Sequence, residues 1–289
     1  MCKSKAEDNA VKVEGYNSAE YSTSGLSRSV TVSTVVDLQK RIIGGQDCGQ
    51  KERPYHVKLR ITDGAHEMFC GGSLISDQWI LTAAHCQEPG WKIYATLGVH
   101  PGPGTPVEIK SAPDVFKRKD VLKIDRIHDI MLLKLPERTK IKPVELPDCN
   151  SCPKIDDTVQ IAGHGATTKG PNNERLDDVS ATLQCANTKV VDCRGLRACV
   201  EKRGPQFYAS KRDQHLFCCQ EENVDISPGD SGGGVVYNDM IYGVISFHGN
   251  DCVEAAAVMD GCGYKEWIIR KTGSIFTKKV KTLPCFGRF

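Results

Sequence analysis

The sequence Gly-Asp-Ser-Gly-Gly at residues 229–233 is the feature that most constrains this chain. Glycines on both sides of one serine permit tight backbone turns, which expose the Ser231 hydroxyl and aim nearby N–H groups at one point. Such donors can hold an oxyanion, so the pattern predicts acyl transfer to a serine. Because a serine alone is a weak nucleophile, this chemistry needs a histidine base and a carboxylate that orients the base.

Two further segments supply these partners. Thr-Ala-Ala-His-Cys at residues 82–86 places His85 among small residues that let other backbone approach, and Asp129 precedes the apolar run Ile-Met-Leu-Leu. An apolar strand can bury the carboxylate of Asp129, whereas Asp120 and Asp125 lack such a run. We therefore predict His85, Asp129 and Ser231 as the catalytic residues.

The order and spacing of these motifs resemble those of the trypsin-like (chymotrypsin-fold) serine proteases, over residues 42–272. Further matching segments are Arg-Ile-Ile-Gly-Gly at 41–45, Phe-Cys-Gly-Gly-Ser-Leu-Ile at 69–75, Gln-Trp-Ile-Leu at 78–81 and Trp-Ile at 267–268. The resemblance implies an all-β fold of two six-stranded antiparallel β-barrels with a C-terminal helix around Trp267. It also implies a serine endopeptidase, a hydrolase that acts on protein or peptide substrates. Short apolar runs at 57–61 and 131–135, separated by glycine-containing turns, are typical of strands.

The resemblance also assigns roles to residues. His85 would accept the Ser231 proton and return it to the leaving amine, while Asp129 stabilises the imidazolium. The backbone N–H groups of Gly229 and Ser231 would form the oxyanion hole. Asp225, six residues before Ser231, occupies the floor of the specificity pocket and favours cleavage after Arg or Lys.

The other expected pocket residues depart from the family pattern. They are Ser246, Phe247, His248, Gly249 and Ala256. The family's pocket walls are opened by glycines, so His248 and Ala256 would narrow the entrance, unless Gly249 is the true wall residue. The alternative function is therefore a catalytically impaired, protease-like binding or toxin-type protein with a narrowed pocket.

Residues 1–41 are mostly small and polar, and we expect them to be a poorly ordered pro-segment. Cleavage after Arg41 would free the amine of Ile42, which in this family folds inward and pairs with the carboxylate of Asp230. We therefore predict a zymogen that an activating protease processes. Residues 273–289 form a basic C-terminal tail of unassigned role.

The 14 cysteines among 289 residues indicate an oxidising compartment, and hence a secreted protein. No apolar run of the N-terminal segment is long enough for a signal peptide or a membrane span, which conflicts with that interpretation. The family's disulfides would join Cys70 to Cys86, Cys48 to Cys185, Cys193 to Cys218 or Cys219, and Cys262 to Cys149 or Cys152. Partners for Cys2, Cys199, Cys252 and Cys285 stay unassigned.

The remaining features point to few other partners. The net charge of +2 argues against nucleic-acid binding, and we expect the basic residues 117–119 to lie in a solvated surface loop. Residues 100–108 contain one carboxylate, too few for a calcium site, so no metal or cofactor is expected. We expect a monomer that protein inhibitors can bind. His164 stands where the family has a tryptophan between two glycines, and we predict a structural role for it.

Overall fold

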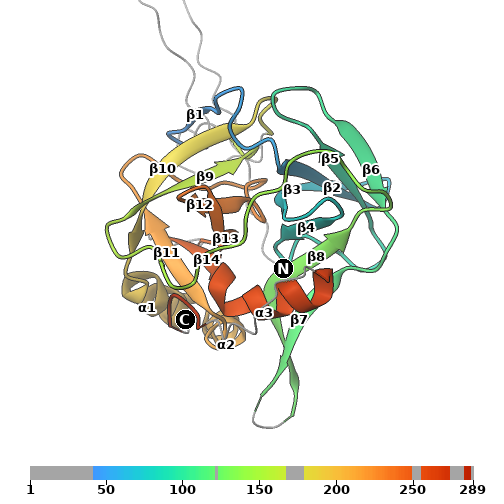
Figure 1. Ribbon diagram of the computed structural model, residues 1–289. Coiled ribbons are helices and arrows are strands. Elements are labelled where there is room, and N and C mark those ends of the chain that lie inside the picture. Colours follow the sequence, from blue (N-terminus) through green and yellow to red (C-terminus); the bar gives the residue numbers. More distant parts are fainter. Residues whose placement is uncertain (1–41, 121–122, 167–178, 249–254, 274–282, 288–289) are drawn as a thin grey trace, which may run out of the picture. The chain divides into compact units, whose positions relative to one another are not determined.

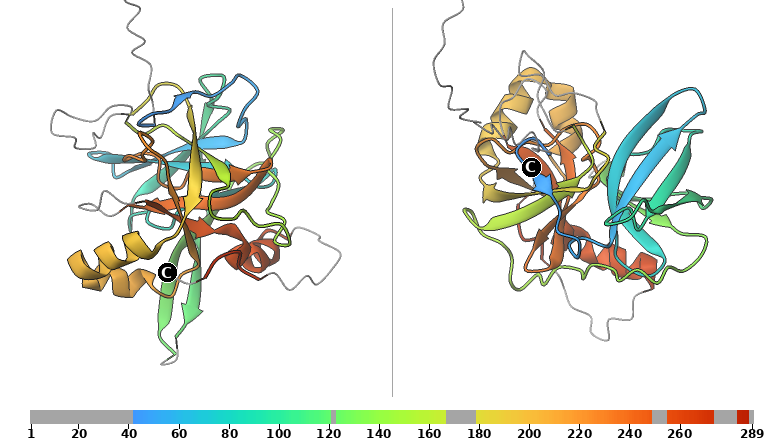
Figure 2. Two further views of the ribbon diagram at one scale, coloured as in Figure 1. Left: turned by 90° about the vertical axis from the view of Figure 1, so that its left-hand side faces the viewer. Right: turned by 90° about the horizontal axis from the view of Figure 1, so that it is seen from above.

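The computed structural model describes residues 42–120, 123–166, 179–248, 255–273 and 283–287, all of which belong to one compact unit (Figure 1). Within these residues the chain forms two antiparallel β-sheets and three helices. The two sheets lie side by side (Figure 2). The predicted all-β architecture with a C-terminal helix is confirmed.

The first sheet contains the strand order β6-β5-β2-β3-β4-β8-β7. Its strands are β2 (His56–Thr62), β3 (Glu67–Leu74), β4 (Trp79–Thr82), β5 (Lys92–Leu97), β6 (Thr105–Ile109), β7 (Asp114–Lys119) and β8 (Asp125–Lys134). In β2 the residues Val57, Leu59 and Ile61 are fully buried while the alternate residues are half-buried, as the period of a strand requires. The run 130–133 of β8 is buried at every position.

The second sheet is a closed barrel. Its strands are β1 (Gln46–Asp47), β9 (Thr158–Gly163), β10 (Gln184–Val191), β11 (Leu216–Gln220), β12 (Gly234–Tyr237), β13 (Met240–Phe247) and β14 (Ala256–Asp260). Strand β9 pairs with both β10 and β12, which closes six strands, and β1 adds to the edge of β10. The prediction of two six-stranded barrels needs correction for the first sheet. Its seven described strands pair in an open order and form a half-barrel.

Helix α3 (Gly261–Thr272) is the predicted C-terminal helix. The side chain of Asp260 accepts the N–H of Cys262 and caps its N-terminus, and Gly273 ends it in the left-handed conformation. Tyr264 and Trp267 are buried and make edge contacts with Phe116 of β7. The helix also packs against β13, so it contacts both sheets.

Two helices between β10 and β11 were not predicted from the sequence. They are α1 (Arg194–Arg203) and α2 (Pro205–Lys211), which Gly204 separates. Leu196 and Val200, one turn apart, form the buried stripe of α1, and a disulfide between Cys193 and Cys218 fixes its start to β11. The pair brings the end of α2 close to β8, because Gln214 donates to the carbonyl of Ile127.

Five disulfides are present among the described residues. They join Cys48 to Cys185, Cys70 to Cys86, Cys149 to Cys262, Cys152 to Cys285, and Cys193 to Cys218. Cys199 is disulfide-bonded as well, and Cys219 is a buried free thiol. Cys2 and Cys252 lie outside the described residues. The structure thus pairs Cys149 with Cys262 and leaves Cys152 to hold the C-terminal segment, where Phe286 stacks on Phe217.

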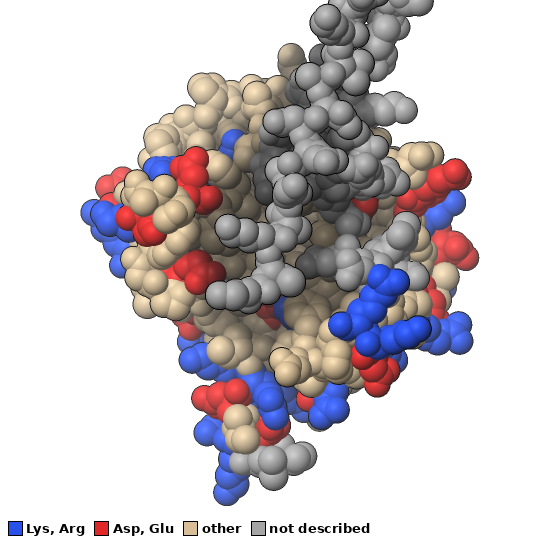
Figure 3. All heavy atoms as spheres, turned by 180° about the vertical axis from the view of Figure 1, so that it is seen from behind, with Lys and Arg blue, Asp and Glu red and all other residues tan. Residues whose placement is uncertain are grey.

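The basic residues 117–119 lie in β7 rather than in a loop, which corrects the prediction. Strands β7 and β8 form a projecting hairpin whose basic and acidic side chains lie together (Figure 3). Lys119 is 3.9 Å from Asp125, and Arg126 is 2.8 Å from Asp120. No described helix is long and apolar enough to cross a membrane.

Candidate active site

His85 lies directly after β4, at the junction of the two sheets. The hydroxyl of Thr82 donates to the carbonyl of Gly71 at 2.7 Å, and the Cys70–Cys86 disulfide ties the same turn to β3. Ala83 and Ala84 are buried. The small residues noted in the sequence thus allow two strands to hold the backbone of His85 from both sides.

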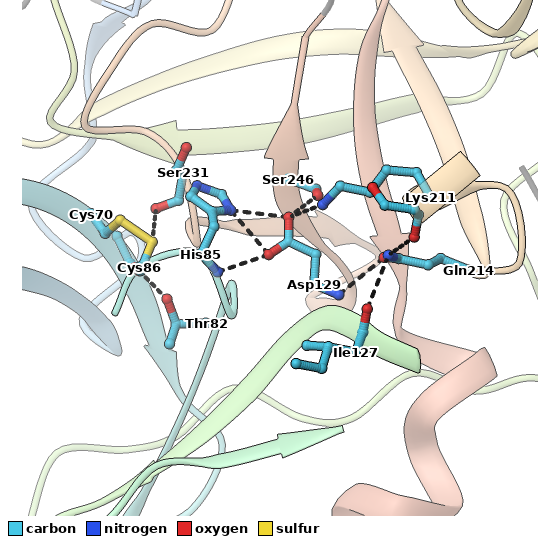
Figure 4. A network of polar contacts seen from close by, with 12 residues as sticks. Cys70, Thr82, His85, Cys86, Ile127, Asp129, Lys211, Gln214, Ser231 and Ser246 are labelled. Carbon is cyan, nitrogen blue, oxygen red and sulfur yellow. Dashed lines mark hydrogen bonds and ion pairs between the residues drawn. A yellow bond between two sulfur atoms is a disulfide. The ribbon is translucent and has the colours of Figure 1, made fainter. Parts of the chain in front are cut away.

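Asp129 lies in β8 and faces His85. Nδ1 of His85 is 3.0 Å from each carboxylate oxygen of Asp129, and the backbone N–H of His85 donates to Oδ1 at 2.9 Å. A carboxylate only accepts hydrogen bonds, so the proton of the neutral ring sits on Nδ1 and leaves Nε2 as the acceptor. Ser231 lies on the other side of the ring from Asp129 (Figure 4). Asp120 and Asp125 are instead paired within the β7–β8 hairpin.

The carboxylate of Asp129 has more partners than the sequence suggested. Its Oδ2 accepts hydrogen bonds from the Ser246 hydroxyl and from Nζ of Lys211, the latter at 2.9 Å (Figure 4). Burial alone raises the pKa of this carboxyl. Hydrogen bonding to His85 and the charges of His85 and Lys211 outweigh burial and hold the pKa of Asp129 well below its usual range.

The loop that carries Ser231 is fixed by backbone contacts. The carbonyl of Ser231 accepts the N–H of Gly71 at 2.7 Å, and the N–H of Gly232 donates to Ile245 at 2.8 Å. Gly232 has a φ of +83°, and a Cβ there would stand 2.2 Å from Oγ1 of Thr82, so only glycine fits. Among the described residues, no acceptor takes the N–H of Gly229 or of Ser231.

Asp230 is fully buried behind this loop. Its carboxylate accepts the backbone N–H groups of Gly165 at 2.8 Å and Ser227 at 2.9 Å, and the Ser227 hydroxyl at 3.2 Å. Among the described residues, none of the hydrogen-bond partners of Asp230 is positively charged. Burial, the largest influence, raises the pKa of Asp230 to about 6, although the N–H donors favour the ionised form.

Ile42 is also fully buried, in the apolar cluster that contains Ile226. The carbonyl of Ile43 accepts the N–H of Asp225 at 3.0 Å, so the segment that starts at Ile42 runs beside the loop of Ser231. A Cβ at Gly44 would stand 1.9 Å from the carbonyl of Asn223, which explains the glycine after the two isoleucines. Arg41 lies outside the described residues.

The expected specificity-pocket residues do not all come together. Asp225 and Ala256 line one cavity of about 30 Å³ with Cys219 and Ile226, room for a water molecule but not for an arginine side chain. The hydroxyl of Ser246 instead donates a hydrogen bond to the carboxylate of Asp129. The width of the specificity pocket as a whole stays a prediction, because one of its expected residues, Gly249, lies outside the described residues.

Phe247 and His248 lie at the end of β13. The ring of Phe247 meets that of Phe207 edge-on, with centroids 4.9 Å apart. His248 is half-buried, and Gly249 lies outside the described residues. Which of His248 and Gly249 forms the pocket wall therefore stays a prediction.

A larger cleft opens on the other side of His85. It has a volume of about 720 Å³, and its lining includes His85, Trp91, Ile127, Asp129 and Lys211.

His164 lies between Gly163 and Gly165, close to Asp230, and its Nδ1 is 3.0 Å from the carbonyl of Ser180. Its ring centroid is 5.5 Å from that of His56. The ring is buried and makes no contact with the His85–Asp129 pair, consistent with the structural role expected of it.

Sequence reasoning missed Lys211, Gln214 and Phe207. Gln214 accepts the N–H of Asp129 at 3.0 Å, and the ring of Phe207 packs edge-on against that of Phe247. All three residues lie in or just after α2, where no motif gave a signal. A helical pattern over 194–211 could have indicated α1 and α2, but not what they contact.

The fold and the site together define a class, the two-barrel serine peptidases. Comparisons with known proteins agree with it. The family model described as Trypsin matches residues 42–268. Snake venom serine protease KN9 of Trimeresurus stejnegeri is 35% identical over 226 residues, covering 74% of this chain and 79% of that protein.

Two further relatives show the same likeness. Kallikrein-8 of Rattus norvegicus is 27% identical over 246 residues, covering 81% of this chain and 87% of that protein. The solved structure of neuropsin, a serine protease expressed in the limbic system of mouse brain, superposes with a TM-score of 0.60. It is 27% identical and covers 79% of this chain and 98% of its own. The chain belongs to the trypsin family of serine proteases.

Proposed function

We propose that this protein is a secreted serine endopeptidase, made as a zymogen and activated by cleavage after Arg41. The observation that carries the proposal is the bond from His85 Nδ1 to the buried carboxylate of Asp129, with Ser231 on the opposite side of the ring. This arrangement holds the imidazole in the tautomer that accepts a proton from a serine hydroxyl.

The reaction follows from these positions. His85 takes the proton of Ser231 as the hydroxyl oxygen attacks the peptide carbonyl, and Asp129 stabilises the imidazolium that forms. The N–H groups of Gly229 and Ser231, which no described acceptor takes, hold the oxyanion. Each such donor contributes about 3–4 kcal/mol to the transition state. His85 then returns the proton to the leaving amine, and water releases the acyl group by the same steps.

Secretion is supported by the disulfides. The described residues contain five, and reducing compartments do not sustain such a number. One relative is a venom protease by name, which fits an extracellular protein. An activating protease and protein inhibitors are the partners we propose, and a monomer the working state.

Activation is supported by two buried residues, Asp230 and Ile42. Ile42 packs in the same apolar cluster as Ile226, which precedes Asp230 in the same loop. A cut after Arg41 would turn the amide nitrogen of Ile42 into an ammonium, the partner that Asp230 lacks among the described residues. Completing this ion pair would fix the loop of Ser231, because Asp230 is its neighbour.

Labelling of the cleaved protein with a fluorophosphonate probe tests the enzyme directly. We expect Ser231 to be labelled, the Ser231→Ala variant to stay unlabelled, and Asp129→Asn to lower kcat by roughly 10⁴-fold. If trypsin is labelled under the same conditions and this protein is not, the proposal fails and a protease-like binding protein takes its place.

For specificity we propose cleavage after Arg or Lys, supported by the charge of Asp225 in the small cavity. The methyl group of Ala256 lines the same cavity, so it limits entry of a long side chain. We expect Ala256→Gly to raise kcat/KM for arginine substrates, and Asp225→Ser to lower it at least 100-fold, roughly the cost of leaving a buried charge unpaired. A peptide library cleaved equally well by both variants would contradict basic specificity.

A further inference from the structure

Lys211, the last residue of α2, places its ammonium against the carboxylate of the predicted catalytic aspartate. Nζ lies 2.9 Å from Oδ2 of Asp129, and the side chains of Lys211 and Asp129 are 12% and 3% exposed. The same ammonium lies 5.4 Å from the ring centre of Phe207 and 5.3 Å from that of Phe247. Two aromatic faces and one carboxylate thus hold the cation in a defined place.

The carboxylate of Asp129 consequently contacts two basic side chains. His85 contacts it from the turn after β4, and Lys211 contacts it from α2 (Figure 4). The other groups that contact its carboxylate or backbone are uncharged, namely the Ser246 hydroxyl of β13 and the Gln214 amide. Tyr264 of α3 adds a phenol within electrostatic reach. Lys211 is therefore the one fixed positive charge that faces this carboxylate from the described residues.

We propose that Lys211 is a positioning residue that takes up part of the charge of Asp129 and so keeps His85 unprotonated to lower pH. A proton on His85 is stabilised by the negative charge beside it and opposed by the positive charge of Lys211 a few ångströms further away. The inference rests on the proposed function, because His85 must be unprotonated to accept the proton of Ser231. It predicts that removing the charge of Lys211 lowers activity at mildly acidic pH relative to wild type.

The test replaces Lys211 by methionine, which keeps the length and apolar stem but not the charge. In Lys211→Met we expect the acidic limb of the kcat/KM profile to move up by about half to one pH unit. Lys211→Arg keeps a cation and should leave the limb in place. Lys202→Met, which removes an exposed lysine from α1, is the matched control and should also leave it in place.

A second measurement does not depend on catalysis. In a Ser231→Ala background, nitrogen-15 NMR follows protonation of the His85 ring, assigned with His85→Gln. The pH midpoint of His85 protonation should rise by about half to one unit in both Lys211→Met and Lys211→Gln. Two variants are used in case one of them folds poorly. The proposal is overturned if the midpoint does not change in Lys211→Met and Lys211→Gln. It is also overturned if the midpoint changes by the same amount in Lys211→Arg, which keeps the positive charge.

The two experiments separate the two proposals. If the cleaved protein does not hydrolyse peptides but the NMR midpoint moves with Lys211, the proposed function fails while the influence of Lys211 on His85 stands. If hydrolysis is observed and neither the limb nor the midpoint moves, the role of Lys211 fails alone.

Discussion

At the scale of single residues, Gln214 is the neutral group that most firmly positions Asp129. It is 2% exposed; its Oε1 accepts the N–H of Asp129 at 3.0 Å, and its Nε2 donates to the carbonyls of Ser210 and Ile127. One amide thereby joins the end of α2 to β8. Removing it leaves buried backbone groups without partners, which costs more than the bonds themselves contribute.

We therefore predict that Gln214→Leu lowers the free energy of unfolding by about 2–4 kcal/mol. Because Asp129 would lose a contact on its own backbone, kcat should also fall, by roughly 10-fold, with little change in KM. Thermal melts and steady-state kinetics measure both. Gln78→Leu is the matched control: its Nε2 donates to one carbonyl, that of Leu135, far along the chain from α2, and kcat should not change.

The sequence indicated the residues that carry strict local patterns. Ser231 has glycines around it that the observed close approaches require, and Asp129 precedes a run that is buried in β8. Lys211 and Gln214 carry no such pattern, since any surface helix can contain a lysine and a glutamine. Their importance arises from where α2 lies, which depends on long-range packing.

At the scale of elements, the two sheets meet at a pair of buried histidines. His56 comes from β2 and His164 from the end of β9, and their ring centroids are 5.5 Å apart. Nε2 of each ring is buried without a hydrogen-bond partner among the described residues. Burial lowers the pKa of His56 well below its usual range and that of His164 to about 4.

This pair predicts a loss of stability in acid. The unfolded chain protonates His164 near pH 6.5, whereas the folded protein keeps it neutral down to about pH 4, so unfolding takes up a proton in this interval. Stability from His164 is present above pH 6.5 and is lost as the pH falls, by about 3 kcal/mol at pH 4. His56 acts in the same direction. Asp230 and Asp260, whose pKa burial raises to about 6, act in the opposite direction.

The difference between wild type and His164→Gln isolates the histidine, since both proteins keep the two aspartates. We expect the melting temperature of the variant, relative to wild type, to rise steadily as the pH is lowered from 7 to 4.5. His66→Gln removes an exposed histidine and should show no such trend. Parallel curves for wild type and His164→Gln would refute the burial argument.

Individual strands could be predicted from the sequence, but their pairing could not. Strand β2 alternates and the run 130–133 of β8 is continuously apolar, so both were predictable from the residues. The open pairing of the first sheet depends on which edges meet, and no local pattern encodes that. Cys149 and Cys152 are three residues apart, so spacing could not decide which reaches Cys262.

At the scale of the whole molecule, the N-terminal segment of the domain is bonded to strands of the closed barrel that lie far along the chain. The guanidinium of Arg53 donates to the side chain and carbonyl of Gln160 in β9 and to the carbonyl of Gly234 in β12. Ile42 is buried in the cluster of the closed barrel. The proposed cleavage just before Ile42 would therefore act next to a residue that is already buried, and we expect its main effect to be the new positive charge.

The ammonium of Ile42 should stabilise the cleaved protein only over a limited pH range. In the uncut chain burial raises the pKa of the Asp230 carboxyl to about 6, so below that pH pairing must first displace the carboxyl proton, and the new ammonium moves this limit somewhat lower. Above about pH 8 an α-amino group loses its proton, and pairing moves this limit somewhat higher. The rise in melting temperature on cleavage should thus be greatest between these limits, reflecting an ion pair whose disruption costs about 3–5 kcal/mol.

An Asp-Asp-Asp-Asp-Lys site placed directly before Ile42 lets enteropeptidase make this cut alone, and calorimetry at pH 5, 7 and 9.5 compares cut with uncut protein. Asp230→Asn should abolish the gain at pH 7, because an amide cannot pair with the ammonium, and proteolytic activity should disappear with it. Asp260→Asn alters another buried aspartate, whose described partners are backbone N–H groups of α3 and of Phe286, so it should keep the gain. A gain that is equal at all three pH values, or that survives in Asp230→Asn, would mean that activation works through something other than this pair.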